Sequence, residues 1–367
     1  MSKRTLLFVF VSLVLLPLRA DTLSDTPAES ADEKPMSLGR MLSQYASTPR
    51  FGGYFIGKYA YSDQDGQHGG EGFSQRFIRL YVDGTILTDF KYRIQLQVNN
   101  ASPHTKDFYV EWAHWQELQV KVGQFKRAFL FENPYNPWDV GFGDYSQVVR
   151  KLSGIGDRNG EPAATGGRDQ GVQLQGDLLP VGADRHRLFH YQVQLMNGQG
   201  INASDKNRRK DLIGSLQVQP LKDLYLGIFG WSGNYVSDGI TVSRKRWAAS
   251  VKYEHEGWSA RAEYAHSTGH KISEYDAATG TFSGTGRADG WYATVGVPCT
   301  PWLKIYAKYD TYRDQGNHDS ERTMYALIPN FQIHKNLLMQ VQLNHVHDRT
   351  AADRDYNEVW AELYVRF

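Results

Sequence analysis

Basic side chains recur at alternate positions in this 367-residue chain. Arg79, Lys91, Arg93 and Lys121 each fall on the polar side of a segment in which polar and apolar residues alternate. Alternate side chains of an extended strand point to the same face. Because rings of lysine and arginine around an aqueous passage favour anions, these residues predict electrostatic attraction of anions rather than bond-making chemistry.

Residues that could hold a metal or carry out catalysis are present, but their spacing indicates no such site. His345 and His347 share one side of a segment without a third ligand at a defined spacing. The glycine-rich stretch 154–160 lacks the Gly-Lys-Ser/Thr ending of a phosphate-binding loop. We therefore predict no catalytic residue, no metal site and no cofactor.

The elements that must position the basic residues are strands with one polar and one apolar face. In residues 90–99, five apolar or aromatic side chains alternate with Lys, Arg, Gln, Gln and Asn. The last eleven residues, 357–367, alternate in the same way and end on Phe367. A globular core would not accept so many long polar side chains without partners, whereas a water-filled lumen does.

Counting such segments predicts an all-β fold, a transmembrane antiparallel β-barrel of sixteen strands. The expected strands are residues 51–61, 73–84, 88–99, 106–115, 117–126, 168–179, 186–197, 208–219, 222–232, 243–255, 257–267, 287–297, 301–312, 320–331, 335–347 and 355–367. Long polar connections follow the odd strands and short ones follow the even strands, as in membrane barrels. The inward or outward orientation of strands 222–232 and 320–331 stays open.

The third long connection, residues 127–167, is far longer than the others. Connections beyond about 12 to 15 residues are usually functional or disordered, and this one is rich in aromatic residues that need a surface to pack on. We predict that it folds into the pore as a constriction; the alternatives are a loop that lies over the barrel mouth, contacts a neighbouring barrel or plugs the lumen. The residues assigned to the constriction are Phe131, Tyr135, Trp138, Arg150, Lys151 and Arg158.

Composition and the amino terminus agree with export from the cytoplasm. A basic start, an apolar run and Leu18-Arg19-Ala20 predict a signal peptide over residues 1–20, followed by a periplasmic segment (21–50) and the barrel (51–367). The mean hydropathy is −0.53, which does not argue against a barrel because only alternate residues face lipid. The formal charge of +1 and a single cysteine identify no partner and exclude a disulfide framework.

The segment Val122–Phe129, which leads into the third connection, resembles the family of phosphate-selective porins O and P. The segments Arg76–Gly84 and Asp89–Arg93 are similar to the second hairpin of that family. The resemblance implies a sixteen-stranded, commonly trimeric barrel, and it adds Lys126 and Arg127 to the expected anion path of Arg79, Lys91, Arg93 and Lys121. Ala128 stands where the family has proline, and arginines alternate with carboxylates instead of forming a ladder.

Together these features predict a porin of the Gram-negative outer membrane that passes small hydrophilic solutes with a modest anion preference, phosphate included. The expected partners are outer-membrane lipid, the barrel-assembly machinery through the terminal Phe367, small anionic or neutral solutes and a homotrimer, but no nucleic acid. The alternatives are a plugged structural barrel and a barrel enzyme of the lipase or protease type. The residues that such an enzyme could place at its rim are His266, Ser267, His270 and Asp348.

Overall fold

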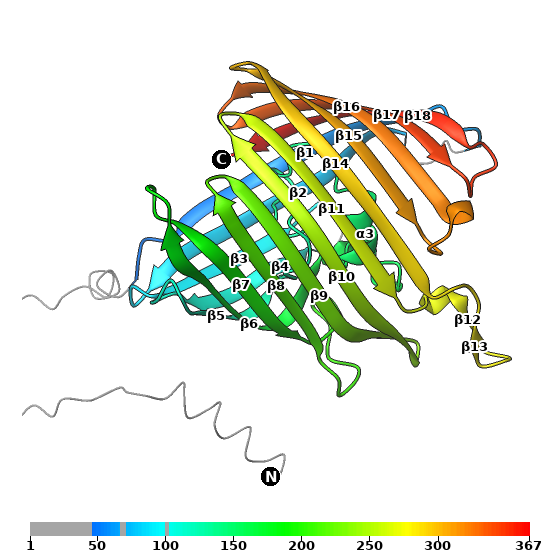
Figure 1. Ribbon diagram of the computed structural model, residues 1–367, viewed down its shortest axis with the longest axis horizontal. Helices are drawn as coiled ribbons and strands as arrows, with labels where there is room; N and C mark the ends of the chain where they lie inside the picture. The colour runs from blue at the N-terminus through cyan, green and yellow to red at the C-terminus, as the bar shows by residue number, and fades with distance from the viewer. Residues whose placement is uncertain (1–45, 67–70, 100–102) are drawn as a thin grey trace, which may run out of the picture. The chain divides into compact units, whose positions relative to one another are not determined.

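The computed structural model describes residues 46–66, 71–99 and 103–367, and in them it shows a closed antiparallel barrel of sixteen strands (Figure 1). The expected signal peptide lies outside the described residues, as does most of segment 21–50. The barrel strands are β1 (Arg50–Ser62), β2 (Gly72–Ile86), β3 (Phe90–Gln97), β4 (His104–Trp112), β5 (Gln119–Lys126), β6 (Arg168–Val181), β7 (His186–Met196), β8 (Asp211–Leu221), β9 (Leu224–Ser237), β10 (Ile240–His255), β11 (Trp258–Thr268), β14 (Arg287–Thr300), β15 (Leu303–Arg313), β16 (Glu321–His334), β17 (Leu337–Asp348) and β18 (Asp355–Arg366).

Each of the sixteen expected strands is confirmed, with ends that shift by a few residues. Between them lie the small hairpin β12 (Tyr275–Asp276) and β13 (Thr281–Phe282), and the short 3-10 helices η2 (Ile272–Glu274) and η3 (His318–Ser320). Residues 127–167, hereafter the third loop, contain helix α3 (Gln147–Leu152) and the 3-10 helix η1 (Ala163–Thr165). No helix among the described residues has the length and apolarity needed to cross a membrane.

Pairing of the first and last strands closes the barrel. β1 runs antiparallel to β18, from Tyr54 opposite Arg366 to Ser62 opposite Glu358. The terminal residue continues this pairing, because Phe367 N donates to Gly53 O (3.1 Å) and Gly53 N donates to Phe367 O (3.2 Å). A barrel closed in this way leaves no unpaired strand edge.

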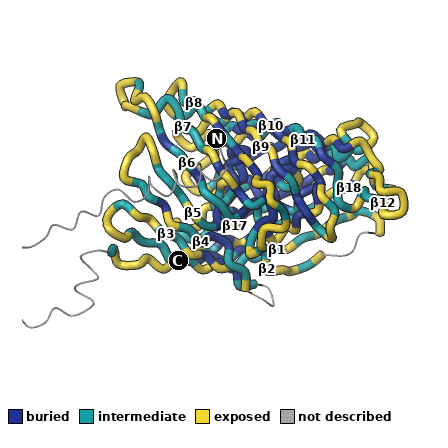
Figure 2. Tube along the Cα trace, turned by 90° about the horizontal axis from the view of Figure 1, so that it is seen from below, coloured by how far each residue is buried: buried dark blue, intermediate teal, exposed yellow. Residues whose placement is uncertain are grey.

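The two faces of the wall differ as the alternation predicts. On β3, Gln95 and Gln97 are buried inside the barrel, whereas Ile94 and Leu96 are exposed on its outer face. Figure 2 shows the buried segments gathered in the interior, with exposed segments at the loops and turns. The wall therefore carries an apolar exterior around a polar interior.

Part of the inner wall departs from this rule and is apolar. On β9, Phe229 and Trp231 face inward, while Ile228 is 61% exposed on the outside. On β16, Met324 and Ile328 are likewise buried on the inner face. The orientation of both strands was open from sequence because each face is apolar. Phe229, Trp231 and Ile328 pack in one cluster with the third loop, whereas Met324 packs with Val346 and Tyr356.

Two register shifts bring extra basic residues into the interior. The pairing of β2 with β1 shifts between Ile56 and Gly57, so that Arg76 and Arg79 both reach inner-wall partners. The pairing of β3 with β4 shifts between Ile94 and Leu96. A bulge of this kind bends a strand and re-aims its side chains.

We predict that Gly123→Ala in β5 destabilises the barrel. Gly123 has φ +132°, and a Cβ there would lie 2.2 Å from Phe108 O. Strain of this kind costs about 1–3 kcal/mol, and the clash with backbone adds to it. Thermal unfolding in detergent measures the loss. Gly230→Ala is the matched control, because a Cβ at Gly230 has no neighbour within 4 Å and should leave the melting temperature within a degree or two.

Candidate functional site: a basic passage beside the third loop

The third loop packs against the apolar part of the inner wall. Phe131 meets Phe229 of β9 edge to face, with ring centroids 5.4 Å apart. Phe142 lies 5.9 Å from Tyr292 of β14 and 6.1 Å from Tyr306 of β15. Helix α3 lies against β11, β14 and β15 and is drawn inside the ring of strands in Figure 1. Apolar burial therefore holds the loop to the β9–β16 side of the barrel.

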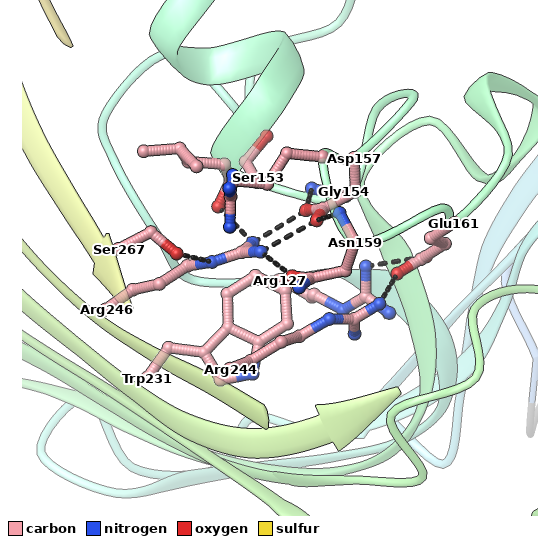
Figure 3. A network of polar contacts seen from close by, with 12 residues as sticks. Arg127, Ser153, Gly154, Asp157, Asn159, Glu161, Trp231, Arg244, Arg246 and Ser267 are labelled. Carbon is pink, nitrogen blue, oxygen red and sulfur yellow. Dashed lines mark hydrogen bonds and ion pairs between the residues drawn. The ribbon is translucent and has the colours of Figure 1, made fainter. Parts of the chain in front are cut away.

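A buried ionic network at the base of the third loop adds a second attachment (Figure 3). Arg127 donates to Glu161 (2.8 Å) and to Asp169 (2.9 Å). Arg244 of β10 reaches the other oxygen of Glu161 (2.5 Å), and Arg246 pairs with Asp157 (2.6 Å). These side chains are all fully buried.

The indole of Trp231 lies at the centre of this network. The guanidinium carbons of Arg127, Arg244 and Arg246 lie 4.7 to 5.1 Å from the Trp231 ring centroid, and Trp231 Nε1 donates to Asp211 (2.8 Å). A guanidinium at this distance from an indole gains a cation–π attraction that is larger where water is excluded. The three arginines are therefore fixed by carboxylates and by one ring at the same time.

The segment of the third loop beside this network is bonded to two other connections. Arg158 donates to Gly269 O and to Asp314 O (3.1 Å), which follow β11 and β15. Asn159 Nδ2 donates to His270 O (2.6 Å), and Ile272 N donates to Asn159 O (3.3 Å). These bonds fasten the loop at the end of the barrel that carries the long connections, hereafter the loop end.

Glu132 is a buried carboxyl group inside the third loop. Its oxygens accept from Ser146 N (2.6 Å) and Ser146 Oγ (2.9 Å). Burial raises the pKa of Glu132 to about 7; nearby Lys308 lowers the pKa and the Glu263 carboxylate raises it. Burial also raises the pKa of Asp157, but Arg246, Arg244 and the Asn159 N–H together outweigh burial, so that this pKa lies below its usual range.

We predict that the third loop is held more firmly at pH 5 than at pH 8. A carboxyl group whose pKa rises from 4.5 to about 7 on folding contributes stability that is full below pH 4.5 and is lost as the pH rises through 7. The full effect is about 3 kcal/mol. Asp157 does not interfere, since its contribution disappears only on acidification below its ordinary range. Melting temperatures of the wild type should fall between pH 5 and pH 8, and E132Q should flatten that fall; an equal fall in both proteins would contradict the prediction.

A water-accessible cavity of about 430 Å³ lies between the third loop and the wall of β1 to β6. We call it the basic cavity, because seven of its lining residues are lysines or arginines and one is an acid, Asp144. Its basic residues are Lys58, Arg76, Arg79, Lys106, Lys126, Arg150 and Arg168. A space lined mainly by one sign of charge concentrates counter-ions of the other sign.

Several of these cations have no acidic partner. Among the described residues, no carboxylate lies within 4.0 Å of the nitrogens of Lys58, Arg79, Lys106 or Lys126. Arg79 donates from Nε to Gln97 (3.1 Å) and from Nη1 to Tyr54 OH (2.8 Å), which leaves Nη2 without a partner in the described part of the chain. Lys106 Nζ bonds only to Ala164 O there. Arg79 and Lys106 therefore retain N–H groups that a solute can use.

Two other basic residues of the cavity are largely bonded to groups of the protein itself. Lys126 Nζ donates to Asn133 O (2.6 Å), Tyr135 O (3.0 Å) and Tyr145 OH (2.9 Å), which uses all its N–H groups. Arg168 holds Asp107 in a bidentate pair at 2.7 and 2.9 Å. Lys126 thus positions the bend of the third loop while it contributes positive charge to the passage.

A second cavity of about 380 Å³ shares Lys126 and Arg168 with the first, so the two meet at these residues. It lies toward the end of the barrel with the short turns, hereafter the turn end, because Lys121 is among its lining residues and pairs with Glu111 beside the β4–β5 turn. We call it the aromatic cavity. Its rings belong to Tyr109, Phe125 and Tyr135.

The structure brings some of the sequence-predicted residues to this passage and places others elsewhere. Arg79, Arg93, Lys121 and Lys126 line the two cavities. Lys91 is exposed near the turn end of β3. Arg127 is fully buried in the anchoring network and lines neither cavity, because Glu161 and Asp169 enclose its guanidinium.

The residues expected at the constriction also divide between anchoring and lining. Phe131, Trp138 and Arg158 hold the third loop; the Trp138 ring lies 5.7 Å from that of Tyr364. Tyr135 lines the aromatic cavity and accepts from Lys252 (2.9 Å). Arg150 lines the basic cavity beside Asp144, and Lys151 is exposed.

Sequence reasoning missed Lys106 and Arg168. Each is followed directly by a buried aspartate, Asp107 after Lys106 and Asp169 after Arg168. Because two consecutive residues are buried, neither position fits a strict alternation of inward and outward side chains. The signal that could have found them is their position at the loop end of β4 and β6, the strands on either side of β5, from which the third loop departs.

The residues considered for a rim enzyme are not assembled into a triad. Ser267 Oγ accepts from Arg246 Nε (3.1 Å) inside the barrel. The His266 ring lies tilted beside that of Trp247, which is exposed on the outer face, with ring centroids 6.3 Å apart. Asp348 is on β17, which is not a neighbour of β11 in the barrel.

Comparison with known proteins places this barrel in a family. The structure is similar to the anion-selective porin from Comamonas acidovorans, with a TM-score of 0.66 at 12% identity over 88% of this chain and 100% of that chain. It is also similar to OmpF of Salmonella typhi in complex with daunomycin (TM-score 0.61, 10% identity, 87% and 97% covered). The trimer form of OmpT from Vibrio cholerae gives a TM-score of 0.60 at 11% identity, with 88% and 100% covered.

Sequence identities of 10 to 12% to these three structures show a shared fold and do not assign a function. No curated protein matches the sequence. The sequence itself matches the family described as Gram-negative porin over residues 28–351. Since this match spans most of the chain, the protein belongs to the Gram-negative porin family and is a β-barrel of the bacterial outer membrane.

Proposed function

We propose that the protein is a passive, non-enzymatic channel for small hydrophilic solutes, and that it prefers anions. The observation that carries the proposal is the basic cavity, in which seven lysines and arginines face one acid. The apolar side chains of the third loop pack against β9–β16, while two cavities remain between the loop and the β1–β6 wall, so solutes cross through these cavities. The proposed anion path runs past Arg79, Lys106, Lys126 and Arg168. Arg93 and Lys121 belong to its turn end, while Lys91 and Arg127 stand outside it.

Arg79 and Lys106 are the residues on which the preference depends most. Each has an N–H group without a partner among the described residues. An anion that loses hydration water at this point gains charge-assisted hydrogen bonds in return. Phosphate is among the anions that we propose, because the segment that leads into the third loop resembles the phosphate-selective porins.

The finer expectations about assembly are also proposals. A homotrimer is supported by the sequence resemblance and by the trimeric form of the similar Vibrio cholerae barrel. Recognition by the barrel-assembly machinery is supported by the terminal Phe367, whose side chain is 73% exposed. Chemical cross-linking and native mass spectrometry of the detergent-extracted protein test the trimer.

Planar-bilayer recording tests the channel proposal. We expect open-channel steps, and in a KCl gradient a reversal potential of the sign given by chloride permeation. A silent barrel would support the plugged alternative, and a silent barrel with hydrolytic activity would support the enzyme. A reversal potential that follows potassium would reject the anion preference and keep the channel.

A further inference from the structure

We infer that the channel selects small aromatic carboxylates, which it holds with the carboxylate in the basic cavity and the ring in the aromatic cavity. The inference rests on the proposed anion channel. It begins from the observation that the two cavities differ in what they offer and meet at Lys126 and Arg168. A solute that spans this meeting point experiences both environments at once.

The basic cavity offers positive charge and open N–H donors. Arg79 Nη2 and the remaining N–H groups of Lys106 have no acceptor among the described residues. Arg79 is held in place by Tyr54 and Gln97, so that its unused edge is fixed before a solute arrives. A carboxylate binds such donors with short, charge-assisted hydrogen bonds.

The aromatic cavity offers little further attraction to a simple anion. Lys121 already pairs with Glu111 (3.3 Å), and Arg93 pairs with Asp83 (3.4 Å). Arg93 also lies over the Tyr81 ring, at 4.4 Å from its centroid. Asp107 is likewise held by Arg168, so the groups left for a solute are side-chain amides, aromatic rings and the Asp139 carboxylate, which attracts no anion.

The rings of the aromatic cavity are arranged for contact with another ring. Tyr109 is half-buried and meets Phe125 edge to face, with centroids 6.3 Å apart and planes at 86°. Tyr135 of the third loop, also half-buried, is a further lining residue of the same cavity. Aromatic pairs gain stabilisation beyond their burial in such edge-to-face and offset arrangements. A flat apolar body is therefore the chemistry that fits here.

An inorganic anion uses only the first of these environments. A flat, uncharged solute uses only the second, and it enters through a cavity in which charge dominates. A carboxylate attached directly to a ring uses both. Benzoate is the simplest probe of this class, and cyclohexanecarboxylate is its matched control because it has the same charge and a similar size without aromatic character.

The test measures how strongly each carboxylate blocks chloride current through the full-length channel in a planar bilayer. We expect benzoate to reach half-block at a concentration about five-fold lower than cyclohexanecarboxylate, the ratio that one aromatic contact gives. Tyr109→Leu should abolish this difference. Tyr225→Leu is the matched control and should keep the difference. Both tyrosines lie beneath a lysine (Lys121 at 4.9 Å from the Tyr109 ring, Lys252 at 4.4 Å from the Tyr225 ring), but Tyr225 lies outside both cavities.

The outcomes separate this inference from the proposed function. Equal block by the two carboxylates, with chloride selectivity intact, overturns the aromatic site and leaves the anion channel standing. Loss of the difference in both tyrosine variants also overturns it, since the effect would then not arise at Tyr109. Potassium selectivity of the wild type overturns the anion channel and this inference with it. The circular-dichroism spectrum and the melting temperature of each variant in detergent show that the barrel has assembled.

Discussion

Replacing both Arg79 and Lys106 with glutamate is expected to lower the chloride-to-potassium permeability ratio by at least about tenfold, which corresponds to about 1.4 kcal/mol. One unit charge at about 4 Å is worth about 1 kcal/mol even in water, and two reversals change four unit charges. Both side chains are nearly fully buried beside the passage, so salt screens them less than it screens surface charges. Reversal potentials in a KCl gradient measure the ratio.

Two further variants test whether the change in permeability ratio arises from the charges of Arg79 and Lys106. The neutral pair R79Q and K106Q should produce about half the change in free energy, because it removes two unit charges instead of four. Lys91→Glu is the control, since Lys91 is exposed near the turn end and outside both cavities. A Lys91 variant that changed the ratio as much as the Arg79 and Lys106 pair would place the filter elsewhere.

Breaking the Arg246–Asp157 pair is expected to release the third loop. Asp157→Asn leaves the Arg246 guanidinium fully buried without its charge partner, and loss of one member of a buried pair costs about 3–5 kcal/mol. Asparagine keeps the size of Asp157, but it can accept from only one of the two backbone N–H groups, Gly154 N on Oδ2 or Asn159 N on Oδ1 (3.0 Å each), so the change removes the charge together with one acceptor. We expect a lower melting temperature and larger, fluctuating conductance steps.

The double variant Arg246→Met with Asp157→Asn separates charge from packing. With both charges removed, much of the lost stability should return, because a buried pair contributes less than the cost of stranding one member. The exposed pair Lys210–Asp205 is the matched surface control, and Asp205→Asn should change stability by less than about 1 kcal/mol. A double variant as unstable as D157N would show that the pair does not act through its charge.

The anchoring network explains why the charged residues at the base of the third loop add little net charge to the pore. Arg127, Arg244 and Arg246 are balanced by carboxylates at the base of the loop and by the Trp231 ring. The cations on the opposite wall have fewer acidic partners. The electrostatics of the passage therefore depend on where carboxylates are absent, rather than on the formal charge of +1.

The sequence by itself determined the sixteen strands, their inward and outward faces and the unusual third loop. These properties are local: a period of two and the length of a connection are written in consecutive residues, as in 90–99 and 357–367. The sequence left the orientation of β9 and β16 open, and the reason is also local, because both faces of these strands are apolar.

Only the tertiary structure decided which basic residues attract a solute. Arg127 is neutralised by Asp169, forty-two positions away, and Arg168 by Asp107 on a non-adjacent strand. Lys106 reaches the interior beside Asp107 where the β3–β4 register shifts, which no strict alternation predicts. The physical reason is that the effect of a charge on a passing ion depends on its distance to other charges, and in a closed barrel those distances join residues far apart in the chain.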